Sequence, residues 1–387
     1  MADVLVFLTS LTLVLLAGII SVSISRKFKI PLPLTLLVSG VILGNIFYNE
    51  RPIIDLGGMF LAVLSVVALV VVLFDSTRKI KIHEYDVSVK DSLRFFVFAL
   101  ILNLIILSFA AKSFFNLQGF SSVIFALLIS CVEYLAIFPR HHLPTNRVTH
   151  FVRNEATLSC AVILLIPFLI LSLGEALNSK LDLTVFGKVI FVATNLFAGI
   201  GAGVIIGLIL FSLLSKNYFE HTAALILGIG LLLSFIIAQR IGGNGYAAVA
   251  TIGFIFGNIF VKPKQMIVKQ ENMIYSALEV LMFIIVGVVV SLPRSLRFFE
   301  FSFGLFLIYL VIRFAVSRIA LRKYDSAEKW EIAFFVPKGL ATVTVAFALL
   351  NFSFTGVVVL VQLLLMFFVY SLVFDTILSK LGFYKHR

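Results

Sequence analysis

The chain has 387 residues, of which 61% are hydrophobic and only 13% are charged. A soluble domain of this length does not need so much apolar surface, so the composition excludes an ordinary soluble enzyme and indicates a membrane protein. The net charge of +12 does not indicate a nucleic-acid partner, because the basic residues are spread over short loops instead of lying on one face.

Apolar runs long enough to cross about 30 Å of hydrocarbon recur from one end of the sequence to the other. We predict an all-α polytopic membrane protein with thirteen transmembrane helices. The first span is read as a retained helix and not a signal peptide, because its positive charges follow the apolar run. In chain order, the predicted spans are 5–25, 31–48, 56–75, 93–115, 121–139, 153–173, 187–214, 221–238, 246–261, 274–292, 301–321, 331–350 and 355–379.

The loops between these spans differ in charge. When the loops are assigned alternately to the two sides, Lys and Arg favour one side by roughly three to one. Loops rich in Lys and Arg stay in the cytoplasm. We therefore predict an integral protein of the plasma (inner) membrane, with its N-terminus outside and its C-terminus in the cytoplasm.

Two segments share the pattern G-x-x-x-G-N-I-F, one beginning at Gly40 and the other at Gly253. They close spans 2 and 9, which cross the membrane in opposite directions. Inverted repeats of this kind are typical of secondary transporters, although G-x-x-x-G alone is also a general helix-packing motif. We predict that spans 1–6 and 8–13 are inverted repeats and that span 7 links them.

Several charged residues lie inside the apolar runs. Counted inward at about 1.5 Å per residue, Glu133 of span 5, Lys338 of span 12, Arg313 of span 11 and Cys160 of span 6 fall near one plane. A charge at the bilayer centre costs at least ~2.5–3.5 kcal/mol, so opposite charges at one depth are expected to neutralise each other. In span 12, Pro337 removes a helical hydrogen bond and predicts a discontinuous helix.

This pattern predicts a site that binds a monovalent cation or a proton. Its charged members would be Glu133 and Lys338, and Ser130 and Ser159 would supply oxygen ligands, which hard cations prefer. A structural salt bridge between two helices is the alternative reading of the buried charges. For Glu155 and Arg313 we favour that structural role.

Cys131, Glu133 and Cys160 also allow a soft-metal site. Cysteine is, however, an ordinary small buried residue in apolar runs. We therefore expect no metal beyond the transported cation, and Cys160 would be a poor ligand for Na⁺ or K⁺.

At these residues the sequence resembles the cation/proton antiporter superfamily, in its sodium/proton exchanger branch, over nearly the whole chain. "FDSTRKI" places Asp75 near the family's Phe-Glu-Gly-Gly-Leu segment, and "SCVEY" places Glu133 at the Asp of Ser-Ala-Thr-Asp-Pro. "EATLSC" keeps Glu155 of Glu-Ser-Leu-x-Asn-Asp, and "PKG" places Lys338 at the Arg of Leu-Arg-Gly.

The sequence also departs from these motifs. Ser159 and Cys160 stand at the Asn and Asp of the span 6 motif, so the usual ion-binding carboxylate is absent there. Val132 and Tyr134 stand at the Thr and Pro of the span 5 motif, which leaves open whether that helix is broken.

The resemblance implies secondary antiport of Na⁺ or K⁺ against protons by alternating access, with a span 11 Arg, Arg313, paired with Glu155. It implies a homodimer formed through scaffold helices. The expected division has scaffold helices in 1–75 and 221–292, core helices in 93–173 and 301–379, and a linker helix at 187–214.

Two other functions remain open at this point. One is a membrane sensor or scaffold that does not transport because its ion site has decayed, and the other is a transporter of an anionic solute held by Lys338. The sequence has no P-loop and suggests no nucleophile triad, so we expect no cofactor and no enzymatic activity.

Overall fold

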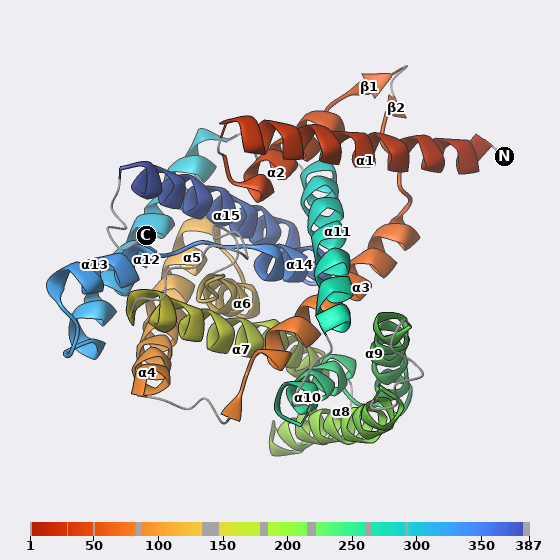
Figure 1. The fold of residues 1–387 in the computed structure, drawn as a ribbon. Helices are drawn as coiled ribbons and strands as arrows, with labels where there is room; N and C mark the ends of the chain where they lie inside the picture. Colours follow the sequence, from red (N-terminus) through yellow and green to blue (C-terminus); the bar gives the residue numbers. More distant parts are fainter. Residues whose placement is uncertain are drawn as a thin grey trace. The chain divides into compact units, whose positions relative to one another are not determined.

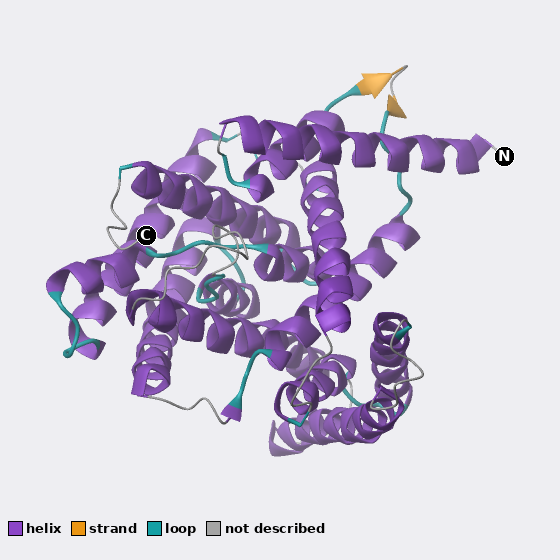
Figure 2. Cartoon of the chain, in the orientation of Figure 1, coloured by secondary structure: helices purple, strands orange, loops and turns teal. Residues whose placement is uncertain are grey.

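The computed structural model describes residues 2–28, 30–48, 51–82, 87–133, 147–178, 185–214, 222–259, 265–290, 293 and 295–381. Nearly all of these residues are helical, and two short paired strands form a small hairpin (Figure 2). Each predicted span contains at least one helix. In the described part of the chain, eight helices are long and apolar enough to cross a membrane, and five further apolar helices are shorter.

The chain forms two compact units, which we describe separately. The first comprises Met1–Ala68, Ser88–Ala156 and Ala277–Arg387. Its first segment holds α1 (Ala2–Phe28), α2 (Leu32–Gly44), β1 (Phe47–Tyr48), β2 (Arg51–Pro52) and the start of α3 (Gly58–Arg78) (Figure 1). Its second segment holds α4 (Val87–Leu102), the π-helical turn Asn103–Leu107, α5 (Ser108–Phe115), α6 (Gly119–Ile129) and the start of α7 (Arg147–Asn178). Its third segment holds the end of α11 (Gln265–Val289), α12 (Leu296–Ala320), α13 (Ser326–Phe334), α14 (Leu340–Leu349) and α15 (Val357–Lys380).

The second unit comprises Leu69–Val87 and Thr157–Ser276. It holds the end of α3, most of α7, the start of α11, and three helices that pack on one another. These three helices are α8 (Val185–Leu214), α9 (Ala223–Arg240) and α10 (Gly245–Asn258).

Two of the predicted spans are interrupted in the first unit. Span 5 ends as a helix at Ile129, and residues 131–133 are not helical. Span 12 is discontinuous, as the Pro-Lys-Gly segment predicts: α13 ends at Phe334 and α14 begins at Leu340. Every residue of α14 is buried, so this helix packs against protein on all sides.

The two G-x-x-x-G segments each pack directly on a neighbouring helix. In the first unit, a Cβ at Gly40 of α2 would lie 2.2 Å from the carbonyl oxygen of Ile284 on α11. In the second unit, a Cβ at Gly257 of α10 would lie 2.2 Å from the carbonyl oxygen of Arg78 on α3. Both approaches require glycine, which lets helix backbones come close together. An inverted repeat that equates spans 2 and 9 also equates spans 3 and 10, so it predicts this matched pair of contacts.

Candidate functional site

The site lies in the first unit, where the interrupted segment after α6 meets the break between α13 and α14. At the end of α6 the helix leaves backbone carbonyls without intrahelical donors, as every helix C-terminus does. Ser130 closes the last turn, because its Oγ donates to the carbonyl oxygen of Ala126 at 2.8 Å. The same Oγ accepts a 2.9 Å hydrogen bond from the amide nitrogen of Asn103. The question that the sequence left open for span 5 is therefore answered, because the helix stops before Glu133.

The other segment runs from Phe335 to Gly339. Pro337 has no N–H, but its carbonyl oxygen accepts a hydrogen bond from the N–H of Glu133 at 2.9 Å, so the two interrupted segments are joined backbone to backbone. Gly339 permits the approach of the Glu133 side chain, because a Cβ at this position would lie 2.6 Å from Glu133 Oε2.

The carboxylate of Glu133 caps the N-terminus of α14. Its Oε1 accepts hydrogen bonds from the N–H groups of Gly339 and Thr342, both at 3.0 Å, and its Oε2 accepts one from Ala341 at 3.1 Å. Three of the four donors that a helix start leaves unsatisfied can be satisfied by one side chain in this way. The positive end of the helix dipole also favours a carboxylate here.

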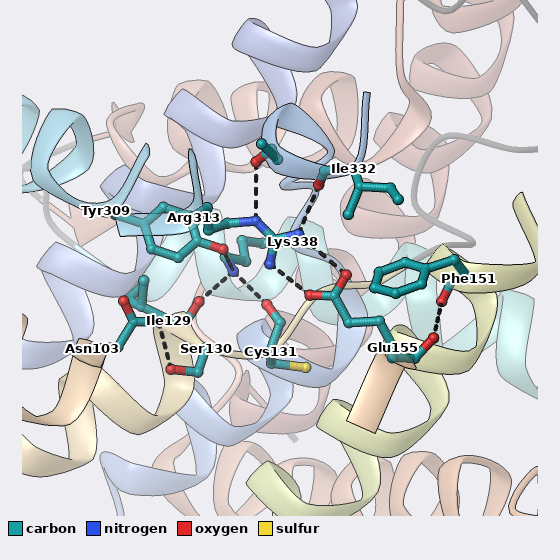
Figure 3. A network of polar contacts seen from close by, with 12 residues as sticks. Asn103, Ile129, Ser130, Cys131, Phe151, Glu155, Tyr309, Arg313, Ile332 and Lys338 are labelled. Atoms are coloured by element: carbon teal, nitrogen blue, oxygen red, sulfur yellow. Dashed lines mark hydrogen bonds and ion pairs between the residues drawn. The ribbon is translucent and has the colours of Figure 1, made fainter. Parts of the chain in front are cut away.

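The ammonium of Lys338 caps the opposite kind of helix end, the C-terminus of α6. Its Nζ donates to the carbonyl oxygens of Ile129 and Cys131 and to the hydroxyl of Tyr309, the last at 3.0 Å (Figure 3). The side chain is fully buried, and the ammonium lies 4.7 Å from the centre of the Tyr309 ring. Carbonyl oxygens at a helix C-terminus carry the negative end of the dipole and favour a cation.

We expected Glu133 and Lys338 to neutralise each other directly. The structure brings both into the same buried crossing, but no ion pair joins them among the described residues. Each charge is instead stabilised by the backbone of the opposite segment. The expectation of a shared buried location was right, and the expectation of direct pairing was wrong, because the two helix ends supply the compensating partial charges.

Glu155 and Arg313 form a separate, closed ion pair. The two carboxylate oxygens of Glu155 accept from the guanidinium at 2.6 and 3.2 Å (Figure 3). Arg313 also donates to the carbonyl oxygens of Ile332 and Ala333, at 3.0 and 3.1 Å, near the end of α13. Both side chains are about 1% exposed, so all of these bonds are shielded from water.

The remaining predicted residues lie in the second unit. Ser159 and Cys160 are buried on α7, in the part of that helix that belongs to the second unit. Asp75 lies on α3 and accepts from Arg78 at 3.1 Å and from Lys79. Tyr134 lies outside the described residues.

Three residues of the site were missed from the sequence. Tyr309 lies one helical turn before Arg313 on α12, and a turn separation of this kind could have placed it on the same face. Thr342 lies in the first turn of α14, where its hydroxyl is 3.4 Å from Glu133 Oε1. Asn103 is an isolated amide in an apolar span, at the start of a π-helical turn, and turns of this kind often occur at functional sites. Its Oδ1 has no hydrogen-bond partner in the described structure.

The chain is similar to known proteins in sequence and in fold. The family model for the transmembrane domain of the sodium/hydrogen exchangers matches residues 11–381. The chain belongs to the sodium/hydrogen exchanger family. It is therefore an integral membrane protein of a cation/proton antiporter family.

Two proteins that are similar to this chain can be compared in detail. The sodium proton antiporter MjNhaP1 of Methanocaldococcus jannaschii has the same fold, with a TM-score of 0.76 at 19% identity, over 96% of this chain and 99% of that one. The K(+)/H(+) antiporter NhaP2 of Shewanella sp. (strain ANA-3) is 20% identical over 360 residues, which is 88% of this chain. This chain matches 62% of the length of that relative.

Proposed function

We propose that this exchanger-family protein is a secondary antiporter that exchanges a monovalent cation, Na⁺ or K⁺, for protons by alternating access. The function is transport and not catalysis of a chemical reaction. The two relatives described above are named for Na⁺ and for K⁺, so both ions are candidates.

The observation that carries the proposal is the buried crossing of two interrupted segments, with Glu133 and Lys338 at its centre. Non-helical backbone inside a membrane is tolerated only where it is buried in protein or lines a cavity. Ion sites in secondary transporters lie between interrupted helices of this kind. A buried carboxylate at such a crossing can hold either a proton or a cation, which is the condition for exchange.

Glu133 is the proposed exchange group. The hydrogen bonds described above give Oε1 two backbone donors and Oε2 one, and each carboxylate oxygen has about two lone-pair sites. Oε2 therefore has an acceptor site left for a proton or a cation. The ammonium of Lys338 stays at the end of α6 and offsets part of the negative charge when the carboxylate is ionised.

Alternating access requires that the crossing face each side of the membrane in turn. We propose that the core helices in 93–173 and 301–379 move against scaffold helices in 1–75 and 221–292, which also form a homodimer. The matched glycine contacts at Gly40 and Gly257 support the inverted repeat on which this division rests. The charge bias of the loops supports a plasma-membrane orientation with the N-terminus outside.

The test is ion exchange by the purified protein in sealed vesicles that hold a pH gradient. Addition of Na⁺ or K⁺ should dissipate the gradient in vesicles with the wild-type protein, and Glu133→Gln should abolish this response. Glu300→Gln on α12, at an exposed position, is the matched control and should exchange normally.

The same assay separates the alternative functions. A folded wild-type protein that responds to no cation would overturn the proposal and favour a sensor or scaffold. A flux that depends on the anion supplied, and that Lys338→Gln inhibits, would favour transport of an anionic solute.

A further inference from the structure

One face of α12 is apolar and exposed over much of its length. Its large exposed side chains include Phe303, Leu307 and Val311, which are 49%, 47% and 65% exposed. Side chains four residues apart lie on the same face of a helix. The helix belongs to the first unit and is one of the candidate membrane spans, so we expect this face to contact hydrocarbon.

Arg318 extends the same face to the end of the helix. It is exposed, and it lies about two helical turns after Val311. The candidate span ends at Ala320, in the same turn as Arg318. The guanidinium therefore lies at the level where a membrane helix meets the lipid headgroups.

Two aromatic rings hold the guanidinium of Arg318 in place. Its Cζ lies 5.1 Å from the centre of the Phe314 ring, one turn earlier on α12, and 5.8 Å from the centre of the Trp330 ring on α13. The helix α13 packs on α12 (Figure 1), and the centres of the two rings are 4.6 Å apart. An arginine that lies against aromatic rings keeps the N–H groups at its edge for an anion.

No carboxylate of the described chain binds this edge of Arg318. The guanidinium has the two ring contacts and no ion pair or hydrogen bond to a described residue. The nearby acidic residues lie elsewhere: Glu328 is 3.9 Å from Arg147, Asp325 caps α13, and Glu331 is buried on α13. The N–H groups of Arg318 are therefore available to an external anion.

The surroundings of Arg318 also suit a lipid headgroup. Trp330 is 38% exposed, and tryptophan is enriched where a membrane meets water. Arg322 and Lys323, which follow α12, are exposed, and no ion pair joins their side chains to a described residue. Asp325 is the exposed carboxylate of this connection, so the described side chains exposed here carry more positive than negative charge.

We propose that Arg318 and Trp330 form a binding site for the phosphate of an anionic phospholipid, whose acyl chains lie along the exposed face of α12. An arginine–phosphate pair is a strong charge-assisted contact, and basic side chains at the end of a span attract anionic lipid. A zwitterionic lipid fits less well, because the cation of its headgroup would approach Arg322 and Lys323.

Two other occupants fit this face less well. A soluble anion would leave the adjoining apolar face of α12 uncovered. A second copy of the chain, related by a two-fold axis along the membrane normal, would bring its own Arg318 to the same depth, so like charges would approach each other. A phospholipid has a charge at the level of Arg318 and hydrocarbon at the level of the apolar face.

The test compares two lipids that differ only in the headgroup. The purified full-length protein in a neutral detergent is given phosphatidylglycerol or phosphatidylcholine with identical acyl chains. Native mass spectrometry counts the lipids that are retained, and thermal unfolding gives the change in Tm. Phosphatidylglycerol is expected to be retained several-fold better than phosphatidylcholine and to raise Tm more.

Variants locate the effect. Arg318→Gln removes the charge and Trp330→Leu removes one ring, and each should reduce phosphatidylglycerol retention several-fold. Arg318→Lys keeps the charge but loses the planar fork, so its retention should lie between those of the wild type and Arg318→Gln. Arg297→Gln is the matched control, because Arg297 is exposed at the other end of α12 and has no described ring contact, and it should retain lipid normally.

Four outcomes would overturn the proposal. Equal retention of the two lipids would remove the role of the headgroup, and an equal rise in Tm with inorganic phosphate alone would make the site one for a free anion. Full retention by Arg318→Gln would place the lipid elsewhere. A change in the number of chains per particle in Arg318→Gln would assign this face to a second copy. Because the readout is lipid binding, each outcome is independent of whether the protein exchanges cations.

Discussion

Glu133 and Lys338 each bind the backbone of the interrupted segment that carries the other. The carboxylate accepts from the first N–H groups of α14, directly after Lys338. The ammonium donates to the carbonyl of Ile129, the last residue of α6, and to that of Cys131, two residues before Glu133. Each helix end thus receives a full charge opposite to its own partial charge. The crossing is neutral as a whole although neither side chain pairs with the other.

Removal of the Glu133 charge is expected to abolish exchange and to weaken the fold. In Glu133→Gln the NH₂ group of the amide replaces one carboxylate oxygen, so a donor faces the backbone N–H groups that this oxygen accepted from. We therefore expect a loss of about 1–3 kcal/mol in the free energy of unfolding. Exchange in vesicles and denaturant unfolding measure the two effects. A variant that exchanges at the wild-type rate would remove Glu133 from the mechanism.

Removal of the Lys338 ammonium is expected to leave a vacant cation position. In Lys338→Ala the carbonyl oxygen of Ile129 loses the ammonium donor, and a buried acceptor left unsatisfied costs about 1–3 kcal/mol. Added ammonium or methylammonium should fill the space and restore part of the lost Tm. Lys338→Met, in which a side chain fills the space, should be destabilised without this rescue, and equal rescue of both variants would contradict the interpretation.

Breaking the Glu155–Arg313 pair is expected to destabilise the protein strongly. Glu155→Leu or Arg313→Met leaves one buried charge without its partner, which costs about 3–5 kcal/mol. The double variant Glu155→Leu/Arg313→Met should lose less than the sum of the two single losses, because no unpaired charge remains. A double-mutant cycle in denaturant measures this coupling, and additive losses would show that the pair is not coupled.

We expect Gly40 and Gly257, which make the two matched helix contacts, to be similarly sensitive to substitution. Gly40→Leu and Gly257→Leu each place a side chain against helix backbone, so each should be destabilised by about 1–3 kcal/mol or fail to fold. Gly304→Leu on α12 is the control, because no atom of a neighbouring segment in the described part of the chain lies within 4 Å of its Cβ position. Yield of folded protein and Tm report the difference. Tolerance of leucine at Gly257 would argue against the close approach of α10 and α3.

Tyr324 lies in the connection between α12 and α13, and we expect it to make the folded protein less stable at alkaline pH. Burial raises the pKa of this phenol above its usual value, although Arg147 opposes the shift. A raised folded-state pKa means that the stabilisation is present below the unfolded pKa of about 10 and is lost as the pH rises through the folded value. Tyr324→Phe should therefore unfold with a weaker dependence on pH above about 10. Unfolding midpoints measured at several alkaline pH values test this, and identical slopes would refute it.

Much of the fold could be predicted from the sequence. The long apolar runs determine where helices cross the membrane, because every backbone polar group in hydrocarbon must be satisfied within the helix. The Pro337 ring dictates a break in span 12, and the two glycine patterns mark close helix contacts. The division into scaffold and core helices, the homodimer and the orientation stay predictions.

The site was only partly predictable. Charged residues in apolar runs had to be buried, and this alone singled out Glu133, Lys338, Glu155 and Arg313. The partners of Glu133 and Lys338 were decided by the tertiary structure, because the groups they bind are backbone N–H and C=O groups, which every residue has. Those groups become available only where a helix ends, and they meet a particular side chain only when segments about 200 residues apart cross.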